Sequence, residues 1–518
     1  MTADQPYFVT TPIYYVNDLP HLGHAYTTVA CDVLARFMRL DGRKVKFLTG
    51  SDEHGQKVEQ SARAAGVPPQ EFCDRISPAW QEMTRLLNIS NDDFIRTTEP
   101  RHVRGVEALW RELDRRGEIY LGRFSGWYSV RDEAFYDESE LVDGPQGRKI
   151  APTGAEVEWL EEDNYFFRLS AWQDRLLAWY EANPDAIAPR SRRNEVISFV
   201  KSGLRDLSIS RTSFSWGIPV PGDPKHVIYV WLDALINYIT ALGYPETRGG
   251  EFATFWPADL HMVGKDILRF HTVYWHAFLM AAGIEPPRRV FAHGWWTVEG
   301  QKMSKSLGNF IPPKELVDRY GLDPVRYFLL RELPFGNDGD FSHRAIVGRL
   351  NGDLANDFGN LAQRVLAMIN RNCGATVPEP GAFAAADNRL LMEAIGLLDD
   401  IRPLIEGQAF HLALETIWQF VAQANRYVDD QAPWALRRSD PQRMQTVLYM
   451  LAEVLRRLGI LVQPFVPGAA AALLDQLAVP VDARSFGDLV IALPHGGELP
   501  APHGIFPRFV EAEAAAGN

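Results

Sequence analysis

Residues 7–49 read YFVTTPIYYVNDLPHLGHAYTTVACDVLARFMRLDGRKVKFLT, and this stretch decides the fold. Residues 7–11 form a short run of β-prone side chains, and residues 14–20 contain several turn formers. From residue 21 to 40 the apolar residues follow a helical spacing, and residues 44–49 predict a second short strand. A strand, a loop, a helix and a strand in this order form the repeating unit of a parallel sheet, so we predict an α/β fold.

The helix of this unit is predicted to begin at the sequence His21-Leu22-Gly23-His24. A helix N-terminus offers unpaired N–H groups and the positive end of the helix dipole, both of which favour a phosphate. Gly23 has no side chain to block a ligand, and imidazole N–H groups can stabilise charge that grows on a phosphoryl group. The alternative is that the two histidines only cap the helix, because short motifs recur by chance.

A second notable stretch, Lys302-Met303-Ser304-Lys305-Ser306, precedes Leu307, Gly308 and Asn309. Lysine carries a compact cation on a flexible stem, so two lysines and two hydroxyls on a loop suit a triphosphate. The alternative is a solvated basic loop without a ligand.

Composition limits the function classes. A chain of 518 residues is expected to form two to four domains, and 46% hydrophobic with 23% charged residues is typical of globular proteins. The net charge of −13 argues against a general nucleic-acid binder, although local patches could still grip one RNA. No signal peptide and no membrane span are visible, so we predict a cytoplasmic protein.

The pattern changes along the chain in a way that predicts five segments. We assign residues 1–116 and 226–298 to the two halves of a Rossmann-like, parallel-sheet catalytic domain. Residues 117–225, rich in turn signals, are predicted to form an inserted connective subdomain. Residues 299–347 would contain the lysine loop, and residues 348–518, which are helical in pattern, would form a C-terminal α-helical bundle with a tail.

Together the histidine and lysine stretches resemble the HIGH and KMSKS signatures of class I aminoacyl-tRNA synthetases. Three further segments resemble the methionine-specific branch of that class, the methionyl-tRNA synthetases: TPIYYVN at 11–17, HVIYVWLDALINY at 226–238 and HMVGKDILRFHTVYW at 261–275. The resemblance implies an enzyme that activates L-methionine with ATP and Mg²⁺ and transfers it to tRNA(Met) for initiation and elongation. The other branches fit less well, because this insertion is too short for a large editing domain and lacks the cysteines of a catalytic zinc site.

The resemblance also implies the residues of each site. His21, His24, Lys302 and Lys305 would be catalytic. The ATP site would consist of His21, Gly23, His24, Gly294, Lys302, Met303, Ser304, Lys305 and Ser306. The methionine site would consist of Ile13, Tyr15, Asp52, Trp231, Ala234, Leu235, Tyr238, His271 and Trp275, with Asp52 on the α-ammonium group. The anticodon would bind to Asn356, Asn360, Arg364 and Trp434. On residue type alone, an aromatic set of this kind is more often plain core. On spacing alone, the last four residues are more often a polar helix face with a tryptophan in the core.

The sequence departs from many relatives in the insertion. Their zinc knuckles use cysteines two residues apart, whereas residues 126–133 here read GWYSVRDE and the later cysteine pair is also missing. The three cysteines, Cys31, Cys73 and Cys373, are far apart. We therefore predict no structural zinc, and a knuckle that relies on packing of aromatic residues and on hydrogen bonds. A dimerisation module found in some relatives is not visible, so we predict a monomer.

Two other functions share parts of this pattern. A nucleotidyltransferase of the same fold could adenylate a small acid without tRNA, but the long helical C-terminal region argues against it. A non-enzymatic descendant could bind tRNA only, but His21, His24, Lys302 and Lys305 are all present.

Overall fold

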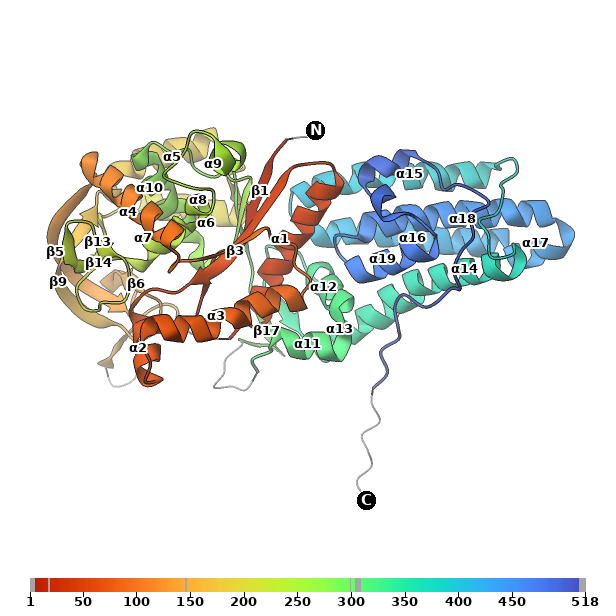
Figure 1. Cartoon of the computed structure of the whole chain (residues 1–518). Coiled ribbons are helices and arrows are strands. Elements are labelled where there is room, and N and C mark those ends of the chain that lie inside the picture. The colour runs from red at the N-terminus through yellow and green to blue at the C-terminus, as the bar shows by residue number, and fades with distance from the viewer. Residues whose placement is uncertain (1–4, 17–18, 145–146, 299, 303–308, 512–518) are drawn as a thin grey trace, which may run out of the picture.

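The computed structural model describes residues 5–511, apart from residues 17–18, 145–146, 299 and 303–308. An α/β part forms one end of the molecule and a bundle of long helices forms the other, with α1 (Leu22–Leu40) at their junction (Figure 1). This arrangement confirms the predicted fold class. No helix within the described residues is both long enough and apolar enough to cross a membrane.

A seven-stranded sheet forms the centre of the α/β part. Its order is β10-β16-β15-β1-β3-β2, and β4 also pairs with β3. All these pairings are parallel. The strands are β1 (Tyr7–Thr10), β2 (Tyr14–Tyr15), β3 (Val45–Asp52), β4 (Asp93–Arg96), β10 (Ile187–Ala188), β15 (Leu260–Gly264) and β16 (Val290–His293). The carboxyl ends of parallel strands form the usual ligand edge of such a sheet.

Both faces of this sheet are buried. Along β1, Tyr7 and Val9 belong to the core on one face, while Phe8 belongs to a second core. Successive side chains of a strand point to opposite faces, which explains the continuous apolar run in the sequence. The helices around the sheet are α1, α2 (Gln56–Ala64), α3 (Pro69–Leu86), α4 (Pro100–Arg115), α7 (Val230–Leu235), α8 (Asn237–Thr240), α9 (Gly250–Phe255) and α10 (Trp275–Ala282).

Most of the strands in the range 117–225 pair in antiparallel fashion. One sheet has the order β11-β9-β5-β6, and its long pair β5–β9 forms the outer end of the molecule (Figure 1). The strands are β5 (Ile119–Ser129), β6 (Ala134–Tyr136), β7 (Val142–Asp143), β8 (Lys149–Ile150), β9 (Glu158–Phe167), β11 (Leu207–Ser208), β12 (Ser210–Arg211), β13 (Pro219–Val220) and β14 (Asp223–Ile228). The range also contains α5 (Gln173–Ala182), α6 (Arg190–Lys201) and β10, and β10 is a strand of the central parallel sheet.

The chain then leads through a small sheet into the bundle. That sheet consists of β17 (Trp296–Val298), β18 (Gln301–Lys302) and β19 (Gly339–Phe341), and the next helices are α11 (Pro313–Tyr320) and α12 (Leu322–Arg331). The bundle contains α13 (His343–Arg349), the π-helix η7 (Leu350–Gly359), α14 (Asn360–Asn372), α15 (Ala385–Glu406), α16 (Phe410–Gln431), α17 (Pro433–Ser439), α18 (Pro441–Val462) and α19 (Pro467–Gln476). Shorter helical turns are η1 (Glu138–Glu140), η3 (Leu169–Trp172), η4 (Lys265–Ile267), the π-helix η5 (Phe270–Tyr274), η8 (Val481–Ala483) and η9 (Phe486–Val490).

Candidate functional site

A cavity of about 790 Å³ lies at the carboxyl ends of the central strands. Its walls include residues that follow or end β1, β3, β15 and β16, together with the first turn of α1. The following predicted site residues line it: Ile13, Tyr15, His21, Gly23, His24, Asp52, Trp231, Ala234, Leu235, Tyr238, His271 and Gly294. The two halves of the predicted catalytic domain therefore meet around one cavity.

Trp275 is the predicted methionine-site residue that does not line this cavity. Its side chain is fully buried, and its indole N–H donates to Nε2 of His261 at 3.3 Å. Its ring lies 6.0 Å from that of Tyr238, which does line the cavity. Trp275 thus supports the pocket wall from behind.

The two histidines of the first turn of α1 both cap the helix. Nδ1 of His21 accepts a hydrogen bond from the Gly23 N–H at 3.0 Å, and Nδ1 of His24 accepts one from the His21 N–H at 3.1 Å. A neutral imidazole that accepts at Nδ1 carries its proton on Nε2. Burial lowers the pKa of His24 well below its usual value, so this ring is neutral. Capping and phosphate binding are therefore compatible, because they use different ring nitrogens.

His293, which the sequence argument did not select, connects this helix to the next loop. Its Nδ1 lies 2.8 Å from the carbonyl oxygen of Gly294, to which it donates, and Nε2 lies 2.7 Å from Oγ1 of Thr27 on α1. Gly294 itself cannot carry a side chain, since a Cβ atom there would lie 2.1 Å from the Asn337 carbonyl oxygen. The fixed turn at Gly294 forms one wall of the cavity next to α1.

Asp52 ends β3 with an incompletely paired carboxylate. The residue is 7% exposed, and its Oδ1 atom has no hydrogen-bond partner in the part of the chain that the structure describes. Burial, Asp233 and Glu133 together raise the pKa of Asp52 well above its usual value. A cationic group in the cavity would offset the cost of ionising Asp52 in this buried site, because an opposite charge favours the ionised carboxylate.

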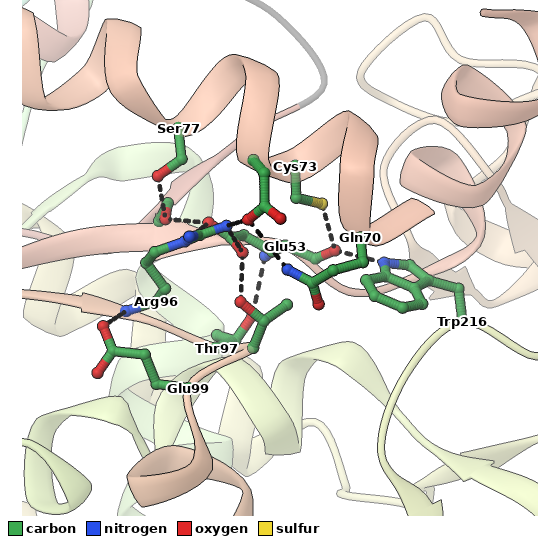
Figure 2. Close-up of polar contacts among 11 residues, drawn as sticks. Glu53, Gln70, Cys73, Ser77, Arg96, Thr97, Glu99 and Trp216 are labelled. Carbon is green, nitrogen blue, oxygen red and sulfur yellow. Dashed lines mark hydrogen bonds and ion pairs between the residues drawn. The ribbon is translucent and has the colours of Figure 1, made fainter. Parts of the chain in front are cut away.

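The neighbouring carboxylate, Glu53, lies outside the cavity lining in a network that Figure 2 shows. Glu53 is fully buried and accepts from Nε and Nη2 of Arg96 at 2.7 and 3.0 Å. The indole N–H of Trp216 donates to the Glu53 carbonyl oxygen at 2.6 Å. Because Arg96 neutralises Glu53, Asp52 is the carboxylate of this pair that remains for a ligand.

Beside Asp52, a third acid is also neutralised by protein groups. The carboxylate of Asp233 lies 2.6 Å from Nδ1 of His54 and 2.8 Å from Nε2 of His102. Burial opposes ionisation, but the two histidines outweigh it and lower the pKa of Asp233 to about 2. This buried set fixes α7, the helix that carries Trp231 and Ala234.

The apolar part of the cavity is lined by neutral, polarisable groups. Burial lowers the pKa of His271 to about 4. Its Nδ1 donates to the Ile267 carbonyl oxygen at 2.9 Å, so Nε2 accepts from the Tyr238 hydroxyl at 2.7 Å. Trp231 stacks on Phe270 with ring centroids 3.7 Å apart. Such a pocket suits a thioether, whose sulfur makes favourable contacts with aromatic rings.

The lysine stretch begins at the same cavity. Trp296 and Thr297 of β17 line it, and Thr297 pairs with Lys302 of β18. Met303, Ser304, Lys305 and Ser306 lie outside the described residues. The backbone thus brings the start of the second signature to the cavity that contains the first.

The inserted subdomain also contributes to the cavity wall, with Arg131, Asp132, Glu133, Ala134, Tyr136 and Thr153. Behind them, the fully buried Arg211 places its guanidinium over the rings of Phe135, Tyr229 and Tyr128 at 4.2, 4.6 and 5.1 Å. The Tyr136 hydroxyl donates to Asp132 at 2.9 Å. Among the described residues, no group of three or more His, Cys, Asp or Glu side chains is placed to hold a metal ion.

The four predicted anticodon residues lie in the bundle. Trp434 is 52% exposed, so it is a surface residue, and the Arg364 guanidinium lies 5.8 Å from its ring. Asn360 begins α14, on which Arg364 also lies. Asn356 lies in η7, and its Oδ1 accepts from Arg508 of the C-terminal segment at 2.5 Å. The structure therefore brings Arg364 and Trp434 together and ties Asn356 to the tail.

Comparisons with known proteins point to one family along nearly the whole chain. Residues 7–366 match the family model described as tRNA synthetases class I (M). Residues 377–516 match the model described as the anticodon binding domain of methionyl tRNA ligase. A methionine–tRNA ligase of Brucella suis biovar 1 (strain 1330) is 58% identical over 510 residues, which cover 98% of this chain and 99% of that protein.

Solved structures agree as well. The methionyl-tRNA synthetase of Mycobacterium tuberculosis in complex with methionyl-adenylate matches with a TM-score of 0.96 and 54% identity, covering 97% of this chain and 100% of that one. The free form of the enzyme from the same organism matches with a TM-score of 0.90 and 51% identity, covering 98% and 99% of the two chains.

Proposed function

This chain belongs to the class I methionyl-tRNA synthetases, the methionine–tRNA ligases, and on that premise we propose which of its residues perform each step. The family activates methionine with ATP and transfers it to tRNA. The rival nucleotidyltransferase is not supported, because the C-terminal region matches an anticodon-binding family.

For methionine binding, we propose that the α-ammonium group lies at Asp52. The buried Asp52 carboxylate has an unpartnered oxygen in the described part of the chain, and an ammonium group satisfies both its charge and its hydrogen-bonding capacity. The thioether then extends along the apolar wall formed by Ile13, Tyr15, Trp231, Ala234, Leu235, Tyr238 and His271, with Trp275 behind it.

For activation, a carboxylate oxygen of methionine attacks the α-phosphorus of ATP. The bond from that phosphorus to the bridging oxygen breaks, and pyrophosphate leaves with the electron pair. The Nε2–H groups of His21 and His24 stabilise the negative charge at the α-phosphate, and the adenine lies against Gly294. Lys302 and Lys305, with Met303, Ser304 and Ser306 in the same loop, hold the departing pyrophosphate.

Magnesium enters as part of the substrate. Mg²⁺ usually binds through phosphate oxygens and keeps several of its waters, with one or two protein carboxylates. We propose that it arrives on the triphosphate and adds positive charge beside the pyrophosphate.

For transfer, a ribose hydroxyl at the 3′ end of tRNA(Met) attacks the carbonyl carbon of methionyl-adenylate, and AMP leaves. The hydroxyl proton passes to a phosphate oxygen of the adenylate. We propose that Arg364, Trp434 and Asn360 meet the anticodon, since an exposed tryptophan offers a base-stacking surface. Asn356 would act through its contact with Arg508. We also propose that the protein is cytoplasmic and monomeric. Light scattering that gives the mass of one chain would support the monomeric state.

One observation carries the proposal: the His21–His24 turn and the strand pair that leads into Lys302 border the same cavity. ATP–pyrophosphate exchange, measured separately with each of the twenty amino acids, tests it. Exchange driven by methionine alone is expected. Exchange that needs another acid, or none at all, would contradict the proposal.

The role of the lysine loop has its own test. Lys305→Ala is expected to slow adenylate formation while leaving the dissociation constant of methionine nearly unchanged. Lys314→Ala is a matched control, because Lys314 is an exposed lysine paired with Asp318 on α11. An unchanged exchange rate in Lys305→Ala would refute the role of the loop.

A further inference from the structure

Glu133 reaches the cavity from the inserted subdomain, between β5 and β6. Its backbone has a φ of 47°, which side-chain-bearing residues rarely adopt. The Tyr229 hydroxyl fixes this conformation by donating to the Glu133 carbonyl oxygen at 2.6 Å. Residues held in such conformations concentrate at functional sites, because the surrounding structure must compensate for the strain.

The carboxylate of Glu133 is buried but only half satisfied. Its Oε1 accepts from the Tyr15 hydroxyl at 2.6 Å and from the Lys57 backbone N–H at 3.2 Å. Its Oε2 is buried with no hydrogen-bond partner in the described part of the chain, and the residue is 4% exposed. Gly55 allows this approach, since a Cβ atom there would lie 2.8 Å from both carboxylate oxygens.

Glu133 and Asp52 therefore form a pair of buried acids at one end of the methionine pocket. Each has one oxygen without a partner among the described residues, and both residues line the cavity. Burial and the proximity of Glu133 raise the pKa of Tyr15, so Tyr15 remains a hydrogen-bond donor. Tyr15 contacts both residues: it pairs with Asp52 across the strands, and its hydroxyl donates to Glu133. Two like charges that act on each other in a buried site are costly unless a cation joins them.

We propose that Glu133 is a positioning and specificity residue for the amino-acid substrate. It holds the Tyr15 ring as a wall of the pocket through the hydroxyl, and its negative charge acts with that of Asp52 to select a ligand with an α-ammonium group. This inference rests on the proposed methionine site. It gives the inserted subdomain a part in methionine recognition, since Glu133 is 118 residues from Tyr15 along the chain.

Because the charge of Glu133 depends on pH, methionine binding should depend on pH as well. Burial raises the pKa of Glu133 to about 7. The groups that face it are Lys57 from α2, Asp52 from β3, Arg211 from β12, and the phenols of Tyr15, Tyr128 and Tyr229. Only the ionised form attracts an ammonium group, so the contribution of Glu133 is nearly complete at pH 8, falls to about half near pH 7 and is lost as the pH falls further.

The decisive variant is Glu133→Gln, which keeps the shape and an acceptor for Tyr15 but removes the charge. At pH 8 we expect the KM for methionine in pyrophosphate exchange to rise about tenfold, with the KM for ATP within twofold of wild type. Glu158→Gln, a change at an exposed position on β9 of the same sheet, is the matched control and should behave as wild type. A Glu133→Gln enzyme with an unchanged KM for methionine, or with equal increases for both substrates, would overturn the inference.

The pH profile of the wild type gives a second readout that does not depend on the variant folding. Between pH 8 and pH 6 the wild-type KM for methionine should rise several-fold, while that of Glu133→Gln should change less because the titrating group is gone. A wild-type KM that stays constant over this range would also overturn the inference. A wild-type enzyme without methionine-dependent exchange would instead overturn the proposed methionine site, and the inference with it.

Discussion

Arg326 and Asp32 form an ion pair of 2.6 Å in which neither side chain is exposed to solvent. Asp32 lies on α1, the helix whose first turn contains His24, and Arg326 lies on α12. The same guanidinium donates to the carbonyl oxygens of Pro464 and Phe465, in the connection between α18 and α19. The helix that bears the proposed phosphate-binding turn is thus fixed directly to the C-terminal bundle.

Removing this arginine should destabilise the protein. Arg326→Met leaves Asp32 buried with Arg36 as its remaining cationic partner, and breaking a buried pair typically costs about 3–5 kcal/mol. We expect a clearly lower midpoint of urea unfolding. Arg85→Met is the control, since the Arg85–Glu82 pair has both side chains 66% exposed and should contribute about 0–1 kcal/mol. Equal midpoints for the two variants would show that the buried pair does not stabilise the junction.

Asp52→Asn should weaken methionine binding selectively. The amide removes the negative charge that pairs with the α-ammonium group, and losing a charged hydrogen bond in a buried site costs about 2–3 kcal/mol. The KM for methionine in the exchange assay should therefore rise roughly 30- to 160-fold, with little change in the KM for ATP. Glu71→Gln, on the exposed side of α3, should have no effect. A methionine KM unaffected by Asp52→Asn would remove Asp52 from the site.

His24→Ala should slow the chemical step. Preorganised donors at developing charge typically contribute about 100- to 1,000-fold to kcat, so kcat for exchange should fall by that order while the KM for methionine stays similar. Burial lowers the pKa of His24, so this imidazole should stay neutral from pH 6 to 8 and add no inflection to the rate profile there. A kcat within a few-fold of wild type would mean that His24 only caps the helix.

Trp434→Ala should affect aminoacylation but not activation. Loss of one stacked base costs about 1–3 kcal/mol, so the KM for tRNA(Met) should rise by roughly 5- to 160-fold, whereas exchange without tRNA should match wild type. Met392→Ala, at a position that is 65% exposed on α15, is the control. If both variants charge tRNA as well as wild type, Trp434 takes no part in anticodon recognition.

The local patterns of the sequence predicted much of the fold. The strand at 7–11, the helix to Leu40 and the next strand correspond to β1, α1 and β3, because apolar periodicity and turn residues act over short distances. The histidine turn and the aromatic residues of the cavity could be predicted from the sequence for two reasons. Some follow the carboxyl end of a recognisable strand, and the others lie in segments that resemble the family strongly.

Other features depend on contacts between distant parts of the chain. Trp275 has the residue type of a pocket wall, but helix packing places it behind Tyr238. Strand β10 lies within the range assigned to the insertion, yet its two residues complete the central sheet beside β16. The contact between Glu133 and Tyr15 is set by where the tip of the inserted hairpin rests, which no local spacing encodes.

The most direct test of the central claim is a crystal structure with a non-hydrolysable analogue of methionyl-adenylate. The expected result places the ammonium group within hydrogen-bonding distance of Asp52, the thioether beside Tyr238 and His271, and the adenine against Gly294. An analogue bound outside this cavity, or with its methionine side chain directed away from Tyr238, would contradict the assignment of the site.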